Sequence, residues 1–449
     1  MARLFGTDGV RGVANEDLTP DLALALGRAA GLVLTREAAR PSGERARVVV
    51  GRDTRVSGPM LEAALVAGLC SAGVDVGLAG IVPTPAVAFI TLEEKAAAGA
   101  VISASHNPVP DNGIKFFSPE GYKIPTTVED AIEDAMKESP AWRPVGAELG
   151  AVDALDDALE RYVEHVAATV DTKLNGLRVV LDCAYGAAWR GGPMAFKAAG
   201  ADVIAMHDEP DGTRINVACG STDMTRLAER VLDEGAHLGI GFDGDADRAL
   251  AVDELGQTVD GDRIISLCAL RLQEQGRLKG ETVVGTVMSN AGFTRALEGR
   301  GIQVVAAPVG DRFVAEEMAA RGAVLGGEQS GHVIFAEHST TGDGILTGLQ
   351  LAQVVAASDA SLSSLAHWYE PWPQVLVNVR VASRDALDGA EAVWEEVGEI
   401  ESALGEDGRV LLRPSGTEPV VRVMVEASDG AAAEAAAWRL AAAVERHLG

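Results

Sequence analysis

The feature that most constrains the fold of this chain is a repeated pattern: a short β-branched run, a Gly-bearing turn, and then an Ala/Leu-rich segment. One example is the run at 48–50, which precedes a helix candidate at 60–72. Strand candidates at 177–182 and 282–287 are each followed by a segment with helical spacing. Such alternation is typical of α/β folds. We therefore predict that the same unit is used in three successive regions.

The C-terminal part of the chain has a different pattern. We expect an apolar strand at 375–381, a strand pair at 409–412 and 420–425, and helices in the Ala/Glu-rich segments. At 449 residues the chain exceeds the usual domain length of roughly 100–200 residues. The predicted fold is α/β, with three similar α/β domains containing mixed sheets and a smaller C-terminal α+β domain around one central cleft. Polar interruptions of the pattern give the expected domains 1–170, 171–257, 258–371 and 372–449.

The net charge limits the partners of the protein. It is formally −28, from 38 basic and 66 acidic residues. An acidic surface repels nucleic acid and anionic lipid, so neither nucleic acid nor a membrane is an expected partner. An anionic substrate would need a local basic or N–H cluster, which makes such clusters informative.

Cysteine spacing and the N-terminus bear on the compartment. The four cysteines form no C-x-x-C pair and no metal-like spacing with a histidine, so free thiols in a reducing compartment are expected. No apolar signal region opens the chain, and the apolar stretch 22–34 is broken by Arg28. We therefore expect a cytoplasmic protein. The cysteines are Cys70, Cys183, Cys219 and Cys268.

The first motif that could carry chemistry is ISASHNP at 102–108. Pro108 disfavours a helix before it, so Ser105 and His106 should lie on a loop at a strand end, where α/β folds bind ligands. The hydroxyl of Ser105 could carry a transferable group. A Ser/Asn turn that caps its own backbone explains the motif equally well. Spacing alone does not choose between Ser103 and Ser105.

The second motif is HLGIGFDGDADR at 237–248. Its glycines match the G-x-G-x-x-G pattern of dinucleotide-binding sites. In those sites a helix follows the glycines, whereas here a strand-like run follows them. Its acidic spacing matches a calcium-binding EF-hand loop, but Arg248 stands where that loop needs Gly. The remaining interpretation is an extended strand-end loop with alternate carboxylates on one side, which would hold a divalent cation, best Mg²⁺. Its ligands would be Asp243, Asp245 and Asp247.

The third and fourth motifs could bind a phosphorylated sugar. The loop GGEQSGH at 326–332 offers a carboxylate, an amide and a hydroxyl to sugar hydroxyls, although a Gly-rich surface turn also explains it. The segment RPSGTEP at 413–419, with Arg422, offers two arginines, two hydroxyls and inward N–H groups to a phosphate. A Pro/Gly turn does not explain the paired arginines.

Gly loops at 5–12 and 309–312 each add one arginine, which could equally form an interface salt bridge.

The four motifs fall one per predicted domain, and together they supply what phosphoryl transfer needs. In this order and over the whole chain they resemble the α-D-phosphohexomutase superfamily. Within it, the segments 5–12, 113–117, 327–332 and 340–344 resemble the bacterial phosphoglucosamine mutases.

This resemblance implies an isomerase that interconverts glucosamine 6-phosphate and glucosamine 1-phosphate on the route to UDP-N-acetylglucosamine. It implies a phosphoserine enzyme and glucosamine 1,6-bisphosphate as the intermediate. The alternative within the superfamily is a phosphomannomutase/phosphoglucomutase. Alternatives from other classes are a hydrolase that uses the same serine and metal, and a non-catalytic sugar-phosphate sensor.

The resemblance also implies roles for individual residues. Ser105 would carry the phosphoryl group, whose oxygen would bind Mg²⁺ together with the three aspartates. Candidates for proton transfer, by placement only, are Lys115, His332 and Arg11, and His106 adjoins the reactive serine. Partners would be a phosphosugar and a kinase or bisphosphate donor for Ser105; the oligomeric state stays open. The substrate-binding residues would be Glu328, Ser330, His332, Arg413, Ser415, Gly416, Thr417 and Arg422.

Overall fold

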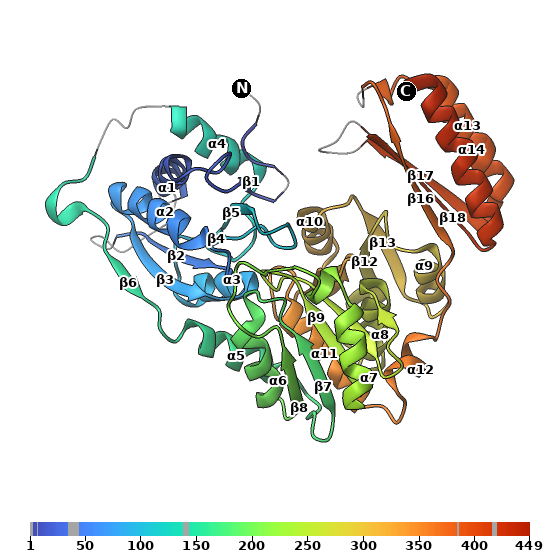
Figure 1. The fold of residues 1–449 in the computed structure, drawn as a ribbon, viewed down its shortest axis with the longest axis horizontal. Coiled ribbons are helices and arrows are strands. Elements are labelled where there is room, and N and C mark those ends of the chain that lie inside the picture. The colour runs from blue at the N-terminus through green and yellow to red at the C-terminus, as the bar shows by residue number, and fades with distance from the viewer. Residues whose placement is uncertain (1–2, 7, 35–44, 138–142, 384–385, 415–419) are drawn as a thin grey trace. The chain divides into compact units, whose positions relative to one another are not determined.

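The computed structural model describes residues 3–6, 8–34, 45–137, 143–383, 386–414 and 420–449 (Figure 1). The chain divides into two compact units. The first comprises Met1–Val284 and Ala307–Ala366, and the second comprises Gly285–Ala306 and His367–Gly449.

The first sheet of the first unit is mixed. Its strand order is β1-β5-β4-β2-β3-β6, with β2, β3, β4 and β6 parallel and with β5 antiparallel to both β4 and β1. The elements of this region are β1 (Val10–Val13), α1 (Pro20–Leu34), β2 (Arg47–Arg52), α2 (Gly58–Ser71), β3 (Asp75–Ile81), α3 (Thr84–Glu93), β4 (Ala98–Ile102), β5 (Asp111–Phe117), α4 (Thr126–Lys137), β6 (Val152–Ala154) and α5 (Ala158–Ala168).

Helices cover both faces of this sheet, which explains the continuous apolar run in β2. Val48 and Val50 face a core that includes Leu26 of α1 and Leu65 of α2. Val49 is also fully buried but lies outside this core, as expected for a strand whose successive side chains alternate between faces. The predicted strand at 48–50 and helix at 60–72 are therefore confirmed, with β2 and α2 starting slightly earlier.

The second sheet has the order β11-β10-β9-β7-β8, in which β7 is parallel to β8 and β9, whereas β10 is antiparallel to β9 and β11. The predicted strand at 177–182 is β7, and the strand-like run after the acidic motif is β10, so both predictions are confirmed. The elements are β7 (Arg178–Asp182), α6 (Ala188–Ala198), β8 (Asp202–Met206), α7 (Thr225–Glu234), β9 (Leu238–Phe242), β10 (Ala249–Asp253) and β11 (Thr258–Val259).

A third region completes the first unit. Here β12 runs parallel to β14, and β14 and β15 form an antiparallel hairpin. Asp343 is the N-cap residue of helix α11. Its carboxylate accepts a hydrogen bond from the N–H of Leu346 at 2.9 Å. The elements are α8 (Gly261–Glu274), β12 (Thr282–Thr286), α10 (Asp311–Arg321), β14 (Leu325–Gly327), β15 (Val333–Phe335), α11 (Gly344–Ala356) and α12 (Leu362–Ala366).

The second unit contains a smaller antiparallel sheet of order β16-β18-β17. Residues of α13 and α14 share one core with apolar residues of these strands, among them Val421 and Val423. The three strands predicted for this region and its α+β character are confirmed. The elements of this unit are α9 (Ala291–Glu298), β13 (Gln303–Ala307), β16 (Gln374–Arg380), α13 (Glu391–Leu404), β17 (Gly408–Pro414), β18 (Val420–Ala427) and α14 (Gly430–Leu448).

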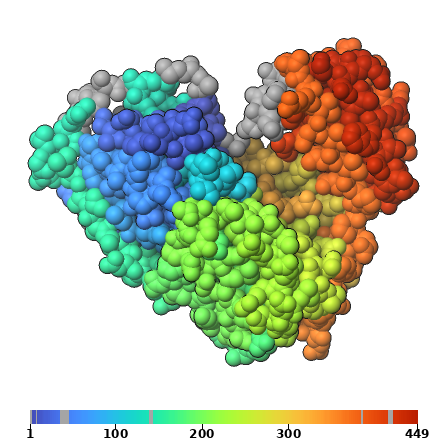
Figure 2. Space-filling view, in the orientation of Figure 1, coloured from blue at the N-terminus to red at the C-terminus, as the bar shows by residue number. Residues whose placement is uncertain are grey.

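Within the first unit, the surface of the segment around β5, cyan in Figure 2, lies directly against the green surface of the second-sheet region. All four cysteines are free, and three of them are buried, as predicted; Cys70 is half-buried. Among the described helices, none combines the length and the apolar character needed to cross a bilayer.

Candidate active site

The loop after β4 separates the roles of its two serines. Ser105 is almost fully buried, and its backbone has a left-handed φ of 51°. The hydroxyl of Ser103 donates to Oδ2 of Asp53 at 2.6 Å and accepts the N–H of Ser105 at 2.9 Å. The hydroxyl of Ser105 instead donates to Oδ2 of Asp243 at 2.6 Å. Ser103 therefore caps the turn, whereas Ser105 faces the acidic loop, and its role as a carrier of a transferable group stays a prediction.

The acidic loop between β9 and β10 brings its aspartates together by a turn. We expected an extended segment with alternate side chains on one side; the extended backbone is wrong, but the three carboxylates do converge. The N–H of Ala246 donates to the carbonyl of Asp243 at 3.1 Å, and Ala246 has a left-handed φ of 56°. Because the chain folds back, one carboxylate oxygen from each of Asp243, Asp245 and Asp247 lies within 4.8 Å of the others.

Lys115, on β5, supplies a counter-charge to this loop. Its Nζ lies 2.8 Å from Oδ2 of Asp245 and 3.5 Å from Oδ2 of Asp247. The adjacent Arg248, a partial counter-charge on sequence grounds, is 3.9 Å from Asp247. Burial opposes the charge of Lys115, but Asp245, Asp8 and Asp247 raise its pKa above the ordinary value. Lys115 is therefore a permanent cation here.

The aspartates of the acidic loop differ electrostatically. Burial, together with the charges of Asp247 and Asp245, raises the pKa of Asp243 well above its ordinary value. Burial also opposes the charge of Asp245, but Lys115 outweighs it and lowers the pKa of that carboxyl. The hydroxyl of Thr84 donates to Asp245 as well, at 2.6 Å. Lys115 therefore compensates Asp245 but not Asp243.

The residues present suit a hard divalent cation. The Oδ1 atoms of Asp245 and Asp247 are buried and find no hydrogen-bond partner within the described part of the chain. All of the candidate metal-ligand atoms are oxygens, which a hard cation prefers. Carboxylates that repel one another are stabilised by a cation between them. The acidic triplet could therefore hold a metal ion beside the hydroxyl of Ser105.

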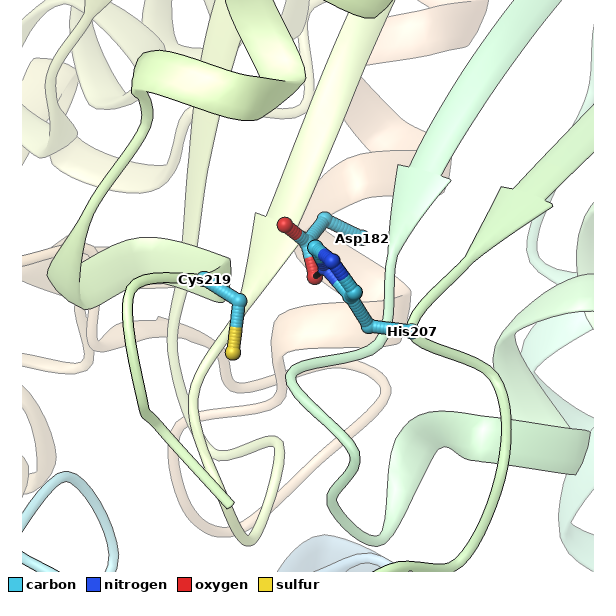
Figure 3. A group of neighbouring side chains, drawn as sticks. All are labelled: Asp182, His207 and Cys219. Carbon is cyan, nitrogen blue, oxygen red and sulfur yellow. Dashed lines mark hydrogen bonds and ion pairs between the residues drawn. The ribbon is translucent and has the colours of Figure 1, made fainter. Parts of the chain in front are cut away.

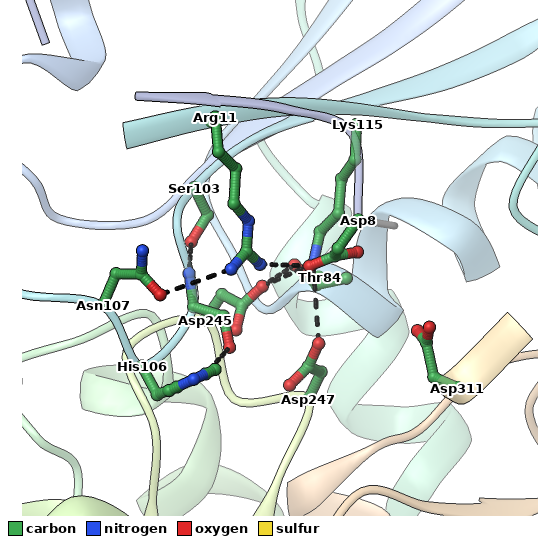
Figure 4. A network of polar contacts seen from close by, with 12 residues as sticks. Asp8, Arg11, Thr84, Ser103, His106, Asn107, Lys115, Asp245, Asp247 and Asp311 are labelled. Carbon is green, nitrogen blue, oxygen red and sulfur yellow. Dashed lines mark hydrogen bonds and ion pairs between the residues drawn. The ribbon is translucent and has the colours of Figure 1, made fainter. Parts of the chain in front are cut away.

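A network of charges extends from this site toward the third region of the first unit (Figure 4). Arg11 and Lys115 reach from the paired strands β1 and β5 toward the acidic loop. Arg11 pairs with Asp8, and Asp8 shares the ammonium group of Lys123 with Asp311. Burial opposes the charge of both Asp8 and Asp311, but neighbouring cations lower the pKa of each carboxyl. The network thus consists of ionised, mutually paired groups.

The sugar-binding candidates lie on the β14–β15 turn. Oε1 of Glu328 accepts the N–H of Gly310 at 3.0 Å, and the hydroxyl of Ser330 donates to Oε2 of the same carboxylate at 3.2 Å. Gly331 has a φ of 92°, and a Cβ there would lie 2.3 Å from the carbonyl oxygen of Ala249. Only glycine fits, so this turn is held tightly against the strand that follows the acidic loop.

The candidates for proton transfer differ in charge and contact. Desolvation of the ring and the positive charges of Arg248 and Arg11 lower the pKa of His106 to about 4, so this ring is neutral at pH 7. Its Nδ1 lies 3.2 Å from the hydroxyl of Ser105. His332 is buried, with Nε2 3.6 Å from Oδ2 of Asp311.

The phosphate-binding candidates lie in the second unit. Arg413 of β17 and Arg422 of β18 are direct cross-strand partners, so their side chains leave the same face of the sheet. The remaining predicted residues, Ser415, Gly416 and Thr417, lie outside the described residues. Their relation to the network around Ser105 stays a prediction.

The arginine of the Gly loop at 309–312, Arg312, forms a salt bridge with Glu129 of α4 at 2.5 Å.

Sequence reasoning missed several residues that contact the serine loop. Asp53 and Arg55 were not considered, although both are fully buried and follow β2 directly. A charged pair at the end of a buried strand was the available signal. Asn216, in the loop before α7, carried no local signal.

A second group of possible metal ligands, Asp182, His207 and Cys219, lies near the ends of β7 and β8 (Figure 3). Nδ1 of His207 pairs with Oδ1 of Asp182 at 2.9 Å, and the same oxygen accepts the N–H of Ala184 at 2.9 Å. Burial raises the pKa of the Cys219 thiol to about 12, so the thiol is protonated at pH 7. These contacts join the loops that follow β7 and β8.

Comparison with protein families places the whole chain in one group. Four models described as phosphoglucomutase/phosphomannomutase match it in order. Alpha/beta/alpha domain I matches residues 2–141, domain II 160–256, domain III 260–371 and the C-terminal domain 376–443.

Individual relatives agree. The phosphoglucosamine mutase of Moorella thermoacetica is 56% identical over 431 residues, covering 96% of each chain. That of Mycolicibacterium smegmatis is 52% identical over 449 residues, covering 99% of each chain. Among solved structures, a phosphoglucomutase/phosphomannomutase family protein from Burkholderia thailandensis aligns with a TM-score of 0.82 and 26% identity, covering 99% of this chain and 97% of the other.

Proposed function

The chain belongs to the phosphoglucosamine mutases of the phosphoglucomutase/phosphomannomutase family, and from this we propose that it interconverts glucosamine 6-phosphate and glucosamine 1-phosphate. The observation that carries the proposal is the 2.6 Å hydrogen bond from the hydroxyl of Ser105 to Asp243. It places an acceptor for a phosphoryl group against three converging carboxylates. The membership confirms the resemblance inferred from the motifs.

Ser105 is the proposed carrier of the phosphoryl group, and the acidic loop is the proposed Mg²⁺ site. Asp243, Asp245 and Asp247 would hold the ion together with an oxygen of the phosphorylated serine. The bound ion would neutralise charge that develops on the phosphoryl group during transfer. Lys115, whose Nζ lies 2.8 Å from Asp245, would add a second positive charge beside the ion.

The reaction consists of two phosphoryl transfers. In the first, the Oγ–P bond of phospho-Ser105 breaks, a new P–O bond forms to the free sugar hydroxyl, and the proton of that hydroxyl ends on Oγ of Ser105. The product is glucosamine 1,6-bisphosphate, which turns around within the enzyme. In the second, the bond between the sugar oxygen and the other phosphoryl group breaks, a new Oγ–P bond forms to Ser105, and the proton of the Ser105 hydroxyl ends on the sugar oxygen. The serine is thus phosphorylated again after each cycle.

Proton transfer needs a group at the sugar hydroxyl. The neighbouring carboxylates raise the pKa of Lys115, so its protonated ammonium group suits the role of proton donor, whereas a general base must be unprotonated before transfer. Arg11 and His332 stay candidates, together with His106 beside the serine. Glu328 and Ser330 are proposed to bind sugar hydroxyls. The phosphate that is not being transferred is proposed to bind to the residues of the fourth motif, which are Arg413, Ser415, Gly416, Thr417 and Arg422.

The experiment that tests this function measures turnover of glucosamine 6-phosphate, glucose 6-phosphate and mannose 6-phosphate side by side. We expect the amino sugar to be converted fastest. Faster conversion of glucose or mannose phosphate would favour the phosphomannomutase/phosphoglucomutase alternative, and release of inorganic phosphate equal to substrate loss would favour a hydrolase. Binding without turnover would indicate a sensor.

Peptide mass analysis completes the test. We expect a phosphoryl group on Ser105 of the purified protein, and Ser105→Ala should lack both the group and the activity. Full mutase activity in Ser105→Ala would refute the proposal. Priming by a kinase or a bisphosphate donor, and the cytoplasmic location, stay predictions.

A further inference from the structure

We propose that Arg55 and Asn216 are positioning residues that together hold the carbonyl of Ser105, and that this carbonyl clamp keeps the Ser105 hydroxyl aimed at Asp243. Nη2 of Arg55 donates to the Ser105 carbonyl at 2.9 Å, and Nδ2 of Asn216 donates to it at 2.8 Å. The inference rests on the proposed role of Ser105 as the phosphoryl carrier.

The backbone of Ser105 needs such a clamp. Its φ of 51° lies in the left-handed region, which is unfavourable for a residue with a Cβ. Residues stay in that region only where surrounding contacts hold them. Relaxation to an ordinary φ would turn the side chain relative to the loop and break the 2.6 Å contact with Asp243.

Arg55 uses its whole guanidinium group for this purpose. Its side chain is fully buried, and Nε pairs with Oδ2 of Asp53 at 2.9 Å. The remaining N–H groups donate to carbonyls of the serine loop: Nη1 to Pro108 at 2.6 Å and Asp111 at 2.9 Å, and Nη2 to Asn107 at 2.8 Å as well as to Ser105. Lysine has three donors around one nitrogen and cannot reproduce this planar set.

Asn216 reaches the same carbonyl from the region of the second sheet. Its Nδ2 also donates to the carbonyl of Asn107 at 3.2 Å. Gly244 of the acidic loop approaches so closely that a Cβ there would lie 2.6 Å from the Ser105 carbonyl oxygen. The clamp therefore fixes the serine loop against the loop that carries Asp243.

The test uses Arg55→Lys and Asn216→Ala in the full-length protein. Matched controls are Arg52→Lys, since Arg52 pairs with Glu62 at 3.2 Å, and Asn175→Ala at an exposed loop position. The first readout is hydrogen–deuterium exchange of peptides covering 103–111. We expect faster exchange there in both clamp variants and unchanged exchange in both controls.

The second readout is steady-state kinetics on the folded fraction, normalised by circular dichroism. A misplaced nucleophile should lower kcat by a factor on the order of 10² while KM changes less than about threefold. A residue that only stabilises the fold would lower the melting temperature and leave kcat of the folded fraction unchanged. If Arg55→Lys does not fold, the exchange and the kcat of Asn216→Ala alone test the proposed clamp.

Unchanged exchange at 103–111 or unchanged kcat in Asn216→Ala would overturn the clamp. The exchange measurement does not depend on the chemistry of Ser105. If wild-type protein carried no phosphoserine while exchange still rose in the variants, the proposed function would fail and the structural clamp would stand without a catalytic role.

Discussion

The hydroxyl of Ser105 donates a 2.6 Å hydrogen bond to the carboxylate of Asp243, although 138 residues separate them in the chain. One residue belongs to the loop after β4, and the other to the turn after β9. The contact joins the proposed phosphoryl carrier to the proposed metal ligands.

The two serines of the loop should respond differently to substitution. Ser105→Ala removes the proposed acceptor and should abolish mutase activity and phosphorylation. Ser103→Ala leaves the acceptor but removes two hydrogen bonds, including the one to buried Asp53, so we expect a loss of stability of about 1–3 kcal/mol and partial activity. Urea unfolding and phosphopeptide mapping measure the two effects. A phosphoryl group on Ser103 in the wild type or in Ser105→Ala would contradict the assignment.

Asp247→Asn should weaken the response to Mg²⁺. It removes a carboxylate whose Oδ1 finds no hydrogen-bond partner in the described residues, and leaves the volume unchanged. We expect the Mg²⁺ concentration for half-maximal activity to rise by a factor on the order of 10², because a ligand charge is lost. The exposed Asp233→Asn on α7 is the control. Identical Mg²⁺ titrations for both variants would argue against the site.

Lys123→Met should destabilise the protein most strongly at neutral pH. The substitution leaves Asp8 and Asp311 without their shared cation, and breaking a buried ion pair costs about 3–5 kcal/mol. Both carboxyls have a lowered pKa in the folded protein, so their pairing contributes stability above their unfolded pKa of about 4 and loses it at lower pH. Thermal unfolding at pH 7.5 and at pH 3, on either side of that unfolded pKa, measures the difference between wild type and variant.

The Lys123 prediction has an internal control. Adding Asp311→Asn to Lys123→Met removes one of the two facing charges and should recover part of the lost stability at pH 7.5. Strictly additive losses in this double-mutant cycle would show that Lys123 and Asp311 are not coupled.

The buried cysteines should resist alkylation. Burial raises the pKa of Cys183 well above its ordinary value and that of Cys268 to about 12, so neither forms a thiolate at pH 8. Iodoacetamide at pH 8 should therefore label at most the half-buried Cys70 in the native protein, and all four cysteines after denaturation. Mass spectrometry gives the count, and native labelling of Cys183, Cys219 or Cys268 would contradict the packing.

Much of the fold was predictable because its signals are local. The apolar run of β2 and the periodicity of α2 follow from a few neighbouring residues, and Pro108 alone sufficed to place Ser105 on a loop. Asp243, Asp245 and Asp247 are close in sequence, so their convergence was predictable too. The turn that produces this convergence was not predictable. It depends on a left-handed φ at Ala246, and alanine gives no sequence signal for a left-handed φ.

The sequence by itself determined the α/β architecture, the loop character of the serine motif and the identity of the acidic triplet. Only the tertiary structure showed that Ser103 and Ser105 have different partners, by giving one hydroxyl to Asp53 and the other to Asp243. It also paired Lys115 with Asp245, 130 residues away. Contacts between distant segments form only when the sheets pack, and they leave no periodicity or spacing in the chain.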